Sequence, residues 1–122
     1  MVFKRLFGRK EESPPRIWSV PEGQRIYAIG DIHGRLDLLD QLILEIERDN
    51  AARSRVRTQI IFLGDLCDRG PNSRGVIERV MQLASASSDV RLIAGNHEEL
   101  LIRAWEGDLR SAGLIGRVGG RE

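Results

Sequence analysis

The chain has 122 residues, of which 41% are hydrophobic and 30% charged, a composition typical of one globular domain and unlike that of disordered or fibrous chains. Its longest apolar runs are far shorter than the roughly 20 residues that a membrane-spanning helix needs. The formal net charge of +1 gives no electrostatic reason to expect nucleic acid as a partner, and a single cysteine excludes a disulfide framework.

The first 22 residues predict an extension that precedes the folded domain. Residues 1–10 combine basic and large apolar residues but lack the apolar stretch of a signal peptide, and Pro14 and Pro15 disfavour a helix. We interpret this extension as disordered, in preference to a peripheral contact with anionic membranes. The lack of a signal peptide and of a membrane-length segment predicts a cytoplasmic protein without stable membrane association.

Residues 23–122 predict an α/β domain built on a parallel sheet, because short apolar runs alternate with helical patterns. The runs are nearly continuous, which is typical of strands buried on both faces. They comprise residues 25–29, 59–63 and 90–94. Apolar residues at spacings of three and four predict a helix after each run. These patterns cover residues 36–46, 76–84 and 98–105, with Ser73 as the expected N-cap of the second helix.

A polar cluster directly follows each predicted strand. The clusters are Gly-Asp-Ile-His-Gly at 30–34, Gly-Asp-Leu-Cys-Asp-Arg-Gly at 64–70 and Gly-Asn-His-Glu at 95–98. A glycine at a strand end permits a sharp turn and a close approach of the backbone to a ligand. Because the ligand crevice of an open α/β sheet lies at the carboxyl ends of its strands, we expect the three clusters to converge there.

The clusters contain residue types that bind divalent metal ions. Asp31 and His33 are two residues apart and should point to the same side of extended backbone, as two ligands of one ion would. Asp65, after the middle strand, has two oxygens that can bridge two ions, and Asn96 offers an amide oxygen to the second ion. Carboxylates crowded into one crevice repel one another unless cations are present. Turns and helix caps would explain one such cluster but not three.

Other phosphate chemistries fit the sequence poorly. A cysteine phosphatase needs an arginine six positions after its cysteine, but Ser73 occupies that position after Cys67 and Arg74 comes one residue late. The sequence contains neither a glycine-rich nucleotide-triphosphate loop ending in Gly-Lys-Ser/Thr nor a Gly-x-Ser-x-Gly nucleophile motif. We therefore interpret Cys67 as a small buried residue and Arg74 as a residue of a helix surface.

In order and spacing, the three motifs resemble those of the calcineurin-like metallophosphoesterases. Within that superfamily they resemble the branch of serine/threonine protein phosphatases and bacterial symmetrical diadenosine tetraphosphatases. The stretch Asp-Arg-Gly-Pro-Asn-Ser at 68–73 fits the same pattern. The resemblance implies that residues 23–122 form the N-terminal βαβαβα half of a four-layer α/β/β/α sandwich.

The resemblance further implies a centre of two divalent metal ions, whether Mn, Fe or Zn. In this sequence, Asp31 and His33 would bind the first ion, Asp65 would bridge both ions, and Asn96 would bind the second. A hydroxide between the two ions would act as the nucleophile.

The resemblance also implies a general acid and a phosphate ligand. His97 would protonate the leaving oxygen, and Asp68 would hold the orientation and charge of His97. Arg69 would bind the phosphoryl oxygens, for which its planar guanidinium is suited. The implied function is metal-dependent hydrolysis of a phosphoester in a phosphorylated protein, a nucleotide or a dinucleotide.

The resemblance is limited to the N-terminal half of such a domain. The family has further histidine ligands and another phosphate-binding arginine downstream, whereas no histidine follows Glu98 here. We therefore expect a truncated form that is weakly active or inactive and whose uncovered apolar sheet favours self-association. The alternative is a non-catalytic phosphate- or metal-binding interaction module that retains the motifs.

Overall fold

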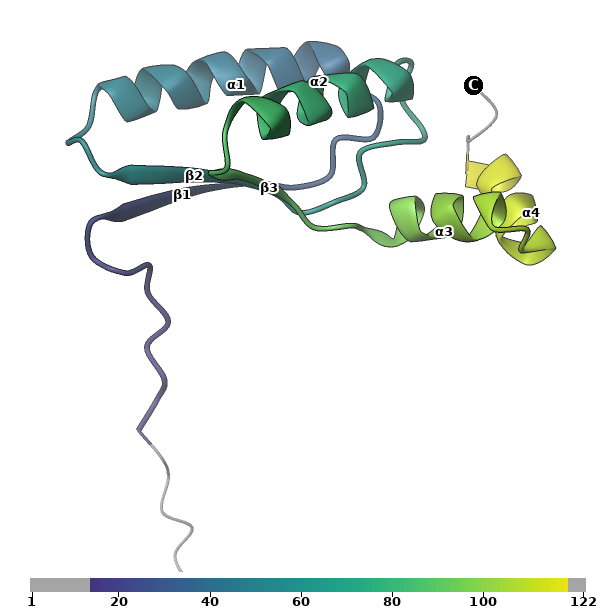
Figure 1. The fold of residues 1–122 in the computed structure, drawn as a ribbon, viewed down its shortest axis with the longest axis horizontal. Helices are drawn as coiled ribbons and strands as arrows, with labels where there is room; N and C mark the ends of the chain where they lie inside the picture. The colour runs from purple at the N-terminus through teal and green to yellow at the C-terminus, as the bar shows by residue number, and fades with distance from the viewer. Residues whose placement is uncertain (1–13, 119–122) are drawn as a thin grey trace, which may run out of the picture.

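The structure is a computed structural model that describes residues 14–118, of which 14–22 lie in an exposed segment without helix or strand. The possible membrane contact of residues 1–10 lies outside the described residues. No helix within residues 14–118 has the length and hydropathy that crossing a bilayer demands. The elements in chain order are β1 (Gln24–Ile29), α1 (Leu36–Ala51), β2 (Arg57–Phe62), α2 (Ser73–Ala86), β3 (Val90–Leu92), α3 (Asn96–Trp105) and α4 (Leu109–Val118) (Figure 1).

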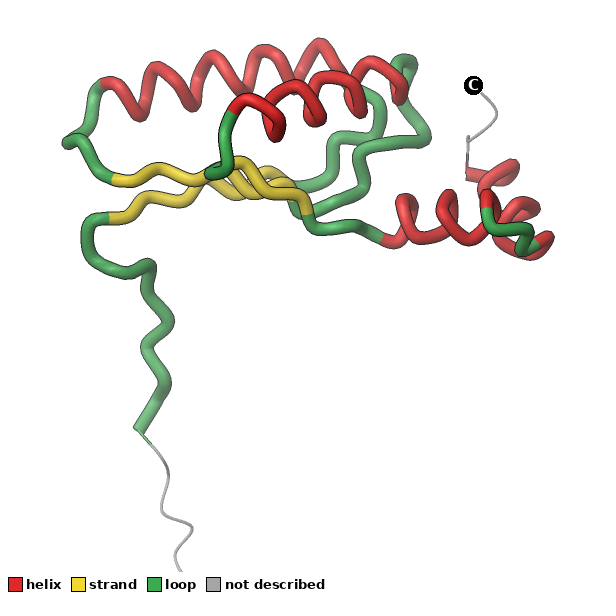
Figure 2. Tube along the Cα trace, in the orientation of Figure 1, coloured by secondary structure: helices red, strands yellow, loops and turns green. Residues whose placement is uncertain are grey.

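Three parallel strands alternate with helices, which confirms the predicted α/β class (Figure 2). The strand order is β1-β2-β3, so that β2 is central as expected, and Ile60 lies opposite Tyr27 on one side and Val90 on the other. The third strand is shorter than predicted and ends at Leu92, although the Ile93 N–H still donates to the Phe62 carbonyl at 2.8 Å. All three strands therefore end at the same edge of the sheet.

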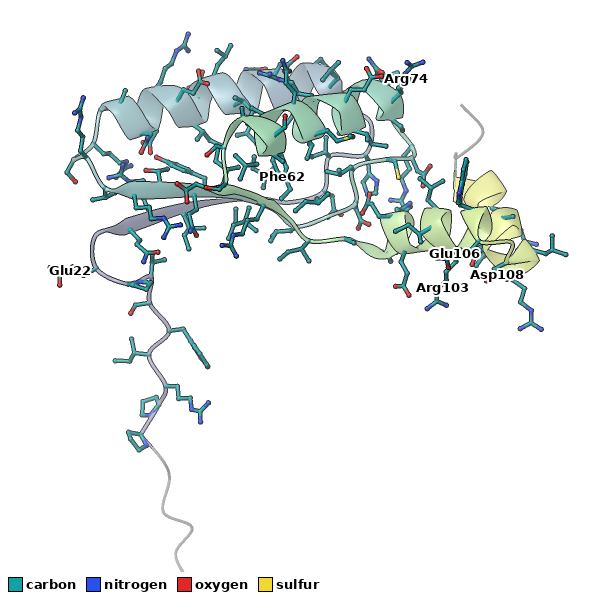
Figure 3. The ribbon with its side chains drawn as sticks, viewed as in Figure 1. Glu22, Phe62, Arg74, Arg103, Glu106 and Asp108 are labelled. Atoms are coloured by element: carbon teal, nitrogen blue, oxygen red, sulfur yellow. The ribbon has the colours of Figure 1, made fainter. Side chains whose placement is uncertain are left out.

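Helices α1 and α2 cover one face of the sheet, and the hydrophobic core lies between them and the strands (Figure 1). Phe62, at the end of the central strand, is fully buried and points from the sheet toward these helices (Figure 3). The helices contribute apolar residues at the predicted spacings of three and four. The buried core residues are Ile29, Ile32, Leu39, Ile43, Ile46, Phe62, Leu66, Val76 and Val80.

The other face of the sheet stays open. The side chains of Ile26, Leu63, Leu92 and Ile93, in and next to the strands, are all exposed. Burial of the strands on both faces, which their apolar runs predicted, is therefore wrong for the described residues, because only one helical layer packs on the sheet. The uncovered apolar sheet surface that we expected is present.

Two helix starts differ from the expectations. The N-cap of α2 is Asn72, whose side chain accepts from the Gly75 N–H at 2.8 Å, so the assignment of Ser73 as N-cap was wrong. The Ser73 hydroxyl instead accepts a hydrogen bond from the Asp68 N–H at 3.0 Å. Helix α3 begins at Asn96, two residues earlier than predicted, because the Glu98 side chain caps the backbone N–H of Gly95 at 2.9 Å.

Helix α4 has no counterpart among the predicted elements. It packs against α3, and its sequence contains Gly113 and Gly116, residues that lower intrinsic helix propensity. Its N-terminus is stabilised by Asp108, whose carboxylate accepts from the Arg110 N–H at 3.0 Å and from the Ser111 hydroxyl at 2.6 Å. Local capping and contact with α3 thus outweigh the weak propensity of the segment.

An ionic cluster joins the end of α1 to β1. The Asp49 carboxylate accepts from the Tyr27 hydroxyl at 2.6 Å and from two guanidinium nitrogens of Arg53 at 2.8 and 2.9 Å. The Arg53 hydrogen bonds, followed by that of Tyr27, lower the pKa of Asp49 to about 2 from its usual 3.8. The Asp49 bond in turn raises the pKa of the Tyr27 hydroxyl.

We predict that Phe62→Ala costs about 3–5 kcal/mol of unfolding free energy, because it removes a large aromatic ring from the centre of the core. Urea denaturation followed by circular dichroism measures this loss. Met81→Ala on the exposed surface of α2 is the control, for which a change within about 0.5 kcal/mol is expected. Equal losses in the two variants would show that Phe62 does not anchor the core.

We predict that Asp49→Asn destabilises the chain at neutral pH but not in strong acid. A carboxylate whose folded pKa is depressed stabilises the fold above its unfolded pKa of 3.8, and this contribution disappears as the pH falls toward about 2. Urea titrations of both proteins at pH 7, 4 and 2 test this. A stability difference that stays constant over the whole range would contradict the prediction.

Candidate functional site

The three polar clusters form loops that meet at the carboxyl ends of the strands (Figure 2). We call residues 30–35, 63–72 and 93–95 the first, second and third site loops. The N–H groups of Ile32 and His33 both donate to the Asp65 carbonyl at 3.0 Å, and the Gly34 N–H donates to the Leu66 carbonyl at 2.8 Å. The first and second site loops are therefore joined backbone to backbone, so that their side chains have fixed relative positions.

The second and third site loops also pack closely. Gly64 has a φ of 99°, and a Cβ atom at this position would overlap the backbone of Gly95. A Cβ atom at Gly95 would overlap the Asp65 carboxylate. The glycines that open the second and third motifs are thus required where their loops touch, whereas a Cβ atom at Gly30, which opens the first motif, would meet no other atom.

The backbone of the site is held in a conformation that most residues avoid. Within residues 14–118, the non-glycine residues with positive φ are His33, Asp65, Asp68 and Arg69, with φ between 46° and 70°. All four are among the predicted site residues. Such conformations cost free energy and cluster at active sites and ligand-binding sites, where the surrounding structure holds them in place.

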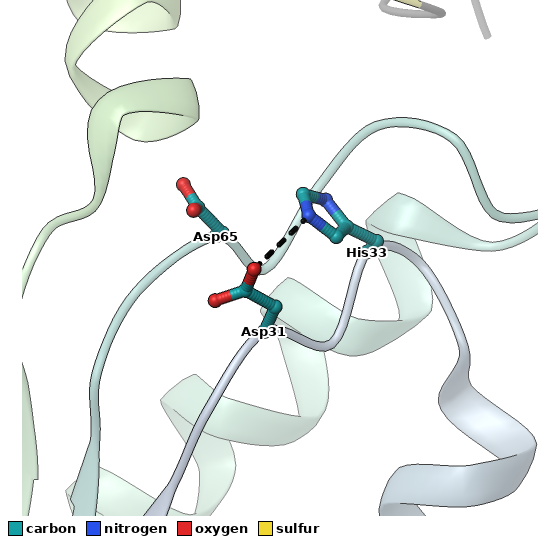
Figure 4. Close-up of side chains that lie close together, drawn as sticks. All are labelled: Asp31, His33 and Asp65. Atoms are coloured by element: carbon teal, nitrogen blue, oxygen red, sulfur yellow. Dashed lines mark ion pairs between the residues drawn. The ribbon is translucent and has the colours of Figure 1, made fainter.

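Three predicted metal ligands converge in this region (Figure 4). One ligand atom each from Asp31, His33 and Asp65 lies within 4.8 Å of the others. Asp31 Oδ2 is 3.6 Å from His33 Nε2, and the Asp31 side chain is exposed to solvent. The Nδ1 atom of His33 is 3.0 Å from the Cys67 carbonyl, which can only accept. Nδ1 of the neutral ring therefore carries the proton, and the lone pair of Nε2 faces the cluster.

This donor set fits a divalent transition metal. Two carboxylates and one imidazole are oxygen and nitrogen ligands of the kind that Mn, Fe and Zn accept. Ligand atoms around one such ion lie about 3 to 4 Å apart, so small side-chain rotations bring these three donors to one ion. The orientation of His33 by a backbone carbonyl is the arrangement typical of histidines that bind metals.

Asn96, the fourth predicted ligand, lies against the Asp65 carboxylate. With its amide nitrogen turned toward Asp65, that nitrogen donates to both carboxylate oxygens at 3.1 Å. With its amide oxygen turned there, three oxygen atoms face one another and need a cation between them. Asn96 can thus pair with Asp65 directly or share an ion with it.

Beside the donor cluster, His97 and Asp68 form a buried pair. His97 Nδ1 is 2.9 Å from Asp68 Oδ2, and the two side chains are only 6% and 7% exposed. Asp68 accepts the Nδ1 proton, which leaves Nε2 of His97 as the free ring nitrogen. The rings of His33 and His97 meet edge to face, with centroids 4.9 Å apart. The His97 N–H also donates to Asp65 Oδ1 at 3.1 Å.

Arg69 is the one predicted site residue that these contacts leave outside the cluster. It is exposed, and within residues 14–118 its guanidinium forms no hydrogen bond or ion pair. It lines a groove of about 740 Å³ next to the cluster, together with Arg35, Leu36, Asp37, Asp40, Gly70, Pro71 and Asn72. Arg35 is paired there with Asp37 through bonds of 2.9 and 2.7 Å, so Arg69 is the cation available to a ligand entering this groove.

Cys67 is buried, as expected, and its surroundings disfavour ionisation of the thiol. Burial, followed by the charges of Asp68 and Glu98, raises the pKa of the thiol to about 12. At neutral pH the reactive thiolate is therefore scarce.

Glu98 is a residue to which sequence analysis assigned no role. Its carboxylate accepts from the backbone N–H groups of Asp65 and Leu66, both at 2.6 Å, and of Gly95 at 2.9 Å. Burial raises the pKa of Glu98, but these three donors outweigh burial and hold the pKa below its usual value. The signal in the sequence was the spacing of Glu98 three residues after the helix cap, as in a capping box.

Comparison with known proteins gives consistent matches. The sequence model of the family described as Calcineurin-like phosphoesterase matches residues 24–119. The chain is 36% identical over 87 residues to the asymmetrical bis(5'-nucleosyl)-tetraphosphatase PrpE of Oceanobacillus iheyensis, covering 69% of this chain and 34% of that protein.

Symmetrical bis(5'-nucleosyl)-tetraphosphatases match the same region. The chain is 35% identical to that of Serratia proteamaculans over 85 residues, 70% of this chain and 27% of that protein. It is 34% identical to that of Delftia acidovorans over 87 residues, 71% of this chain and 28% of that protein. The chain thus spans about a third or less of the length of these relatives. Because the family match covers well over half of the chain, the chain belongs to the calcineurin-like phosphoesterases.

Proposed function

We propose that this chain carries the metal-binding and acid-catalytic part of a metal-dependent phosphoester hydrolase. The observation that supports this most strongly is the convergence of Asp31, His33 and Asp65 beside the buried pair of His97 and Asp68. Metal ligands and a histidine with a carboxylate partner, next to each other at the ends of parallel strands, are what phosphoryl transfer to water requires.

Asp31, His33 and Asp65 would hold one divalent ion, and Asp65 with Asn96 would hold a second. Divalent ions bound there would neutralise phosphoryl charge and lower the pKa of water. The protein contributes the rigid positions of the ligands, since backbone hydrogen bonds between the first and second site loops orient Asp31 and His33 relative to Asp65. The Asp65 carboxylate lies close to donors on both sides, Asp31 and His33 on one and Asn96 on the other.

His97 would give its Nε2 proton to the leaving oxygen. Asp68 accepts from Nδ1 of this ring, which stabilises the charged imidazolium and leaves Nε2 free for the transfer. Burial of both partners keeps water from competing for this hydrogen bond. The guanidinium of Arg69, at the edge of the neighbouring groove, would bind phosphoryl oxygens through two parallel hydrogen bonds.

Among phosphoesters, we propose a dinucleoside polyphosphate as the substrate in preference to a phosphorylated protein. The support is that the relatives described above are named as tetraphosphatases of bis-nucleosyl substrates. A groove with a cation beside the donor cluster could hold the part of a polyphosphate that extends beyond the reacting phosphorus.

We predict that the chain binds Mn²⁺ and that Asp65→Asn weakens this binding about tenfold or more, because the substitution removes a charged ligand. Isothermal titration with Mn²⁺ measures the affinity. Glu45→Gln, on the exposed surface of α1, removes the same charge away from the site and should leave the affinity unchanged. Equal affinities in all three proteins would contradict the assignment of the metal ligands.

We predict that the chain cleaves diadenosine tetraphosphate slowly and only with Mn²⁺. Arg69→Ala should lower kcat/KM about 10- to 100-fold, because it removes a charged hydrogen bond to the phosphate. Chromatography of the nucleotide products provides the rates. Arg74→Ala is the control, since Arg74 points into solvent from α2 and pairs with Glu78 (Figure 3).

Three outcomes of this assay separate the hypotheses. Faster release of phosphate from a phosphoserine peptide than of nucleotide would contradict the proposed substrate class. Mn²⁺ binding without hydrolysis of either compound would support the non-catalytic metal-binding module instead. Equal activity of the Arg69 and Arg74 variants would exclude Arg69 as a phosphate ligand.

A further inference from the structure

We propose that Glu98 is a positioning residue that holds Asp65 in place by binding the turn at residues 64–66 to the start of α3. This inference rests on the proposed function in one respect, namely that Asp65 is a metal ligand. Glu98 does not point at the metal donors itself; it accepts hydrogen bonds from the backbone that carries one of them.

The contacts of Glu98 join two of the three site loops. Oε2 accepts from the N–H groups of Asp65 at 2.6 Å and Gly95 at 2.9 Å, whereas Oε1 accepts from the N–H of Leu66 at 2.6 Å. Hydrogen bonds to a charged carboxylate are shorter and stronger than bonds between neutral groups. Both oxygens are used, so only a carboxylate can satisfy all three donors at once.

The turn that Glu98 binds needs such support. Gly64 has a φ of 99° and Asp65 a φ of 53°, so two successive residues adopt left-handed conformations. Asp65 is not a glycine, and this conformation is unfavourable for its side chain. The N–H groups of Asp65 and Leu66 both point to Glu98, and without its carboxylate these partly buried donors would lose their partners.

The Asp65 side chain completes a closed ring of hydrogen bonds. Glu98 binds the Asp65 N–H, and the Asp65 carboxylate in turn accepts from the N–H of His97, the residue directly before Glu98. The same carboxylate lies 3.1 Å from the Asn96 amide. Loss of Glu98 would therefore free the carboxylate of Asp65 to move away from Asn96, His33 and Asp31.

The neighbouring Glu99 provides a matched control. It also lies in the first turn of α3, but it is exposed and pairs with Arg103 on the same helix. Glu98→Gln and Glu99→Gln remove the same charge from adjacent positions. A general effect of negative charge at this helix N-terminus would appear in both variants.

The first measurement is the Mn²⁺ affinity of the full chain by isothermal titration, below the unfolding temperature of every variant. We expect Glu98→Gln to lower the affinity about 10- to 100-fold, as loss of an outer partner of a metal ligand does, and Glu99→Gln to leave it unchanged. A purely structural role would lower the melting temperature without this loss of affinity. If the wild-type chain binds Mn²⁺ and folded Glu98→Gln binds it with the same affinity, the inference is overturned but the proposed function is not.

The second measurement needs no metal and no substitution. Amide hydrogen exchange by NMR on the wild-type chain should show the Asp65, Leu66 and Gly95 amides exchanging at least about 100-fold more slowly than exposed loop amides. Exchange at the rate of exposed amides would overturn the role of Glu98 directly, whether or not Glu98→Gln folds. Protected amides in a chain that binds no Mn²⁺ would instead contradict the proposed metal site and leave the turn contact established.

Discussion

The site depends on one constraint, which is that three strand ends in a parallel sheet must turn within a few residues of one another. Their loops have no room for side chains where they touch, and Gly64 therefore packs directly on Gly95. The backbone of Gly34 forms hydrogen bonds with the backbones of Leu66 and Asn72. Backbone hydrogen bonds between the loops replace the ladder that ends at Phe62 and Leu92. The polar side chains then project from a framework that has little freedom to rearrange.

Rigidity of this kind is needed because the site is chemically unfavourable without its ligands. Asp31 and Asp65 bring negative charge together, and four non-glycine residues of the site loops adopt positive φ. Those costs are offset at the sheet, where Phe62 and the apolar faces of α1 and α2 form the core immediately below the loops. The division between a packed layer and a strained edge is common in proteins whose binding residues lie on loops.

The fold also presents apolar surface that the described residues do not cover. Ile26, Leu92 and Ile93 are exposed on the sheet, and Trp105 and Leu109 are almost fully exposed at the junction of α3 and α4. The relatives are about three or more times longer than the segments that match this chain.

The sequence predicts the class of fold, the order of the first six elements and a set of candidate site residues. Its apolar runs and motif spacing suffice for this, because alternation of strand and helix places each motif at a strand end. Other placements depend on the tertiary structure: Arg69 lies apart in a groove, and Glu98 contacts the turn at Asp65. These depend on backbone angles and on contacts between residues about 30 positions apart, which local sequence patterns do not encode. Helix α4 was not predicted for the same reason. Its glycines disfavour a helix, and a tertiary contact with α3 stabilises it.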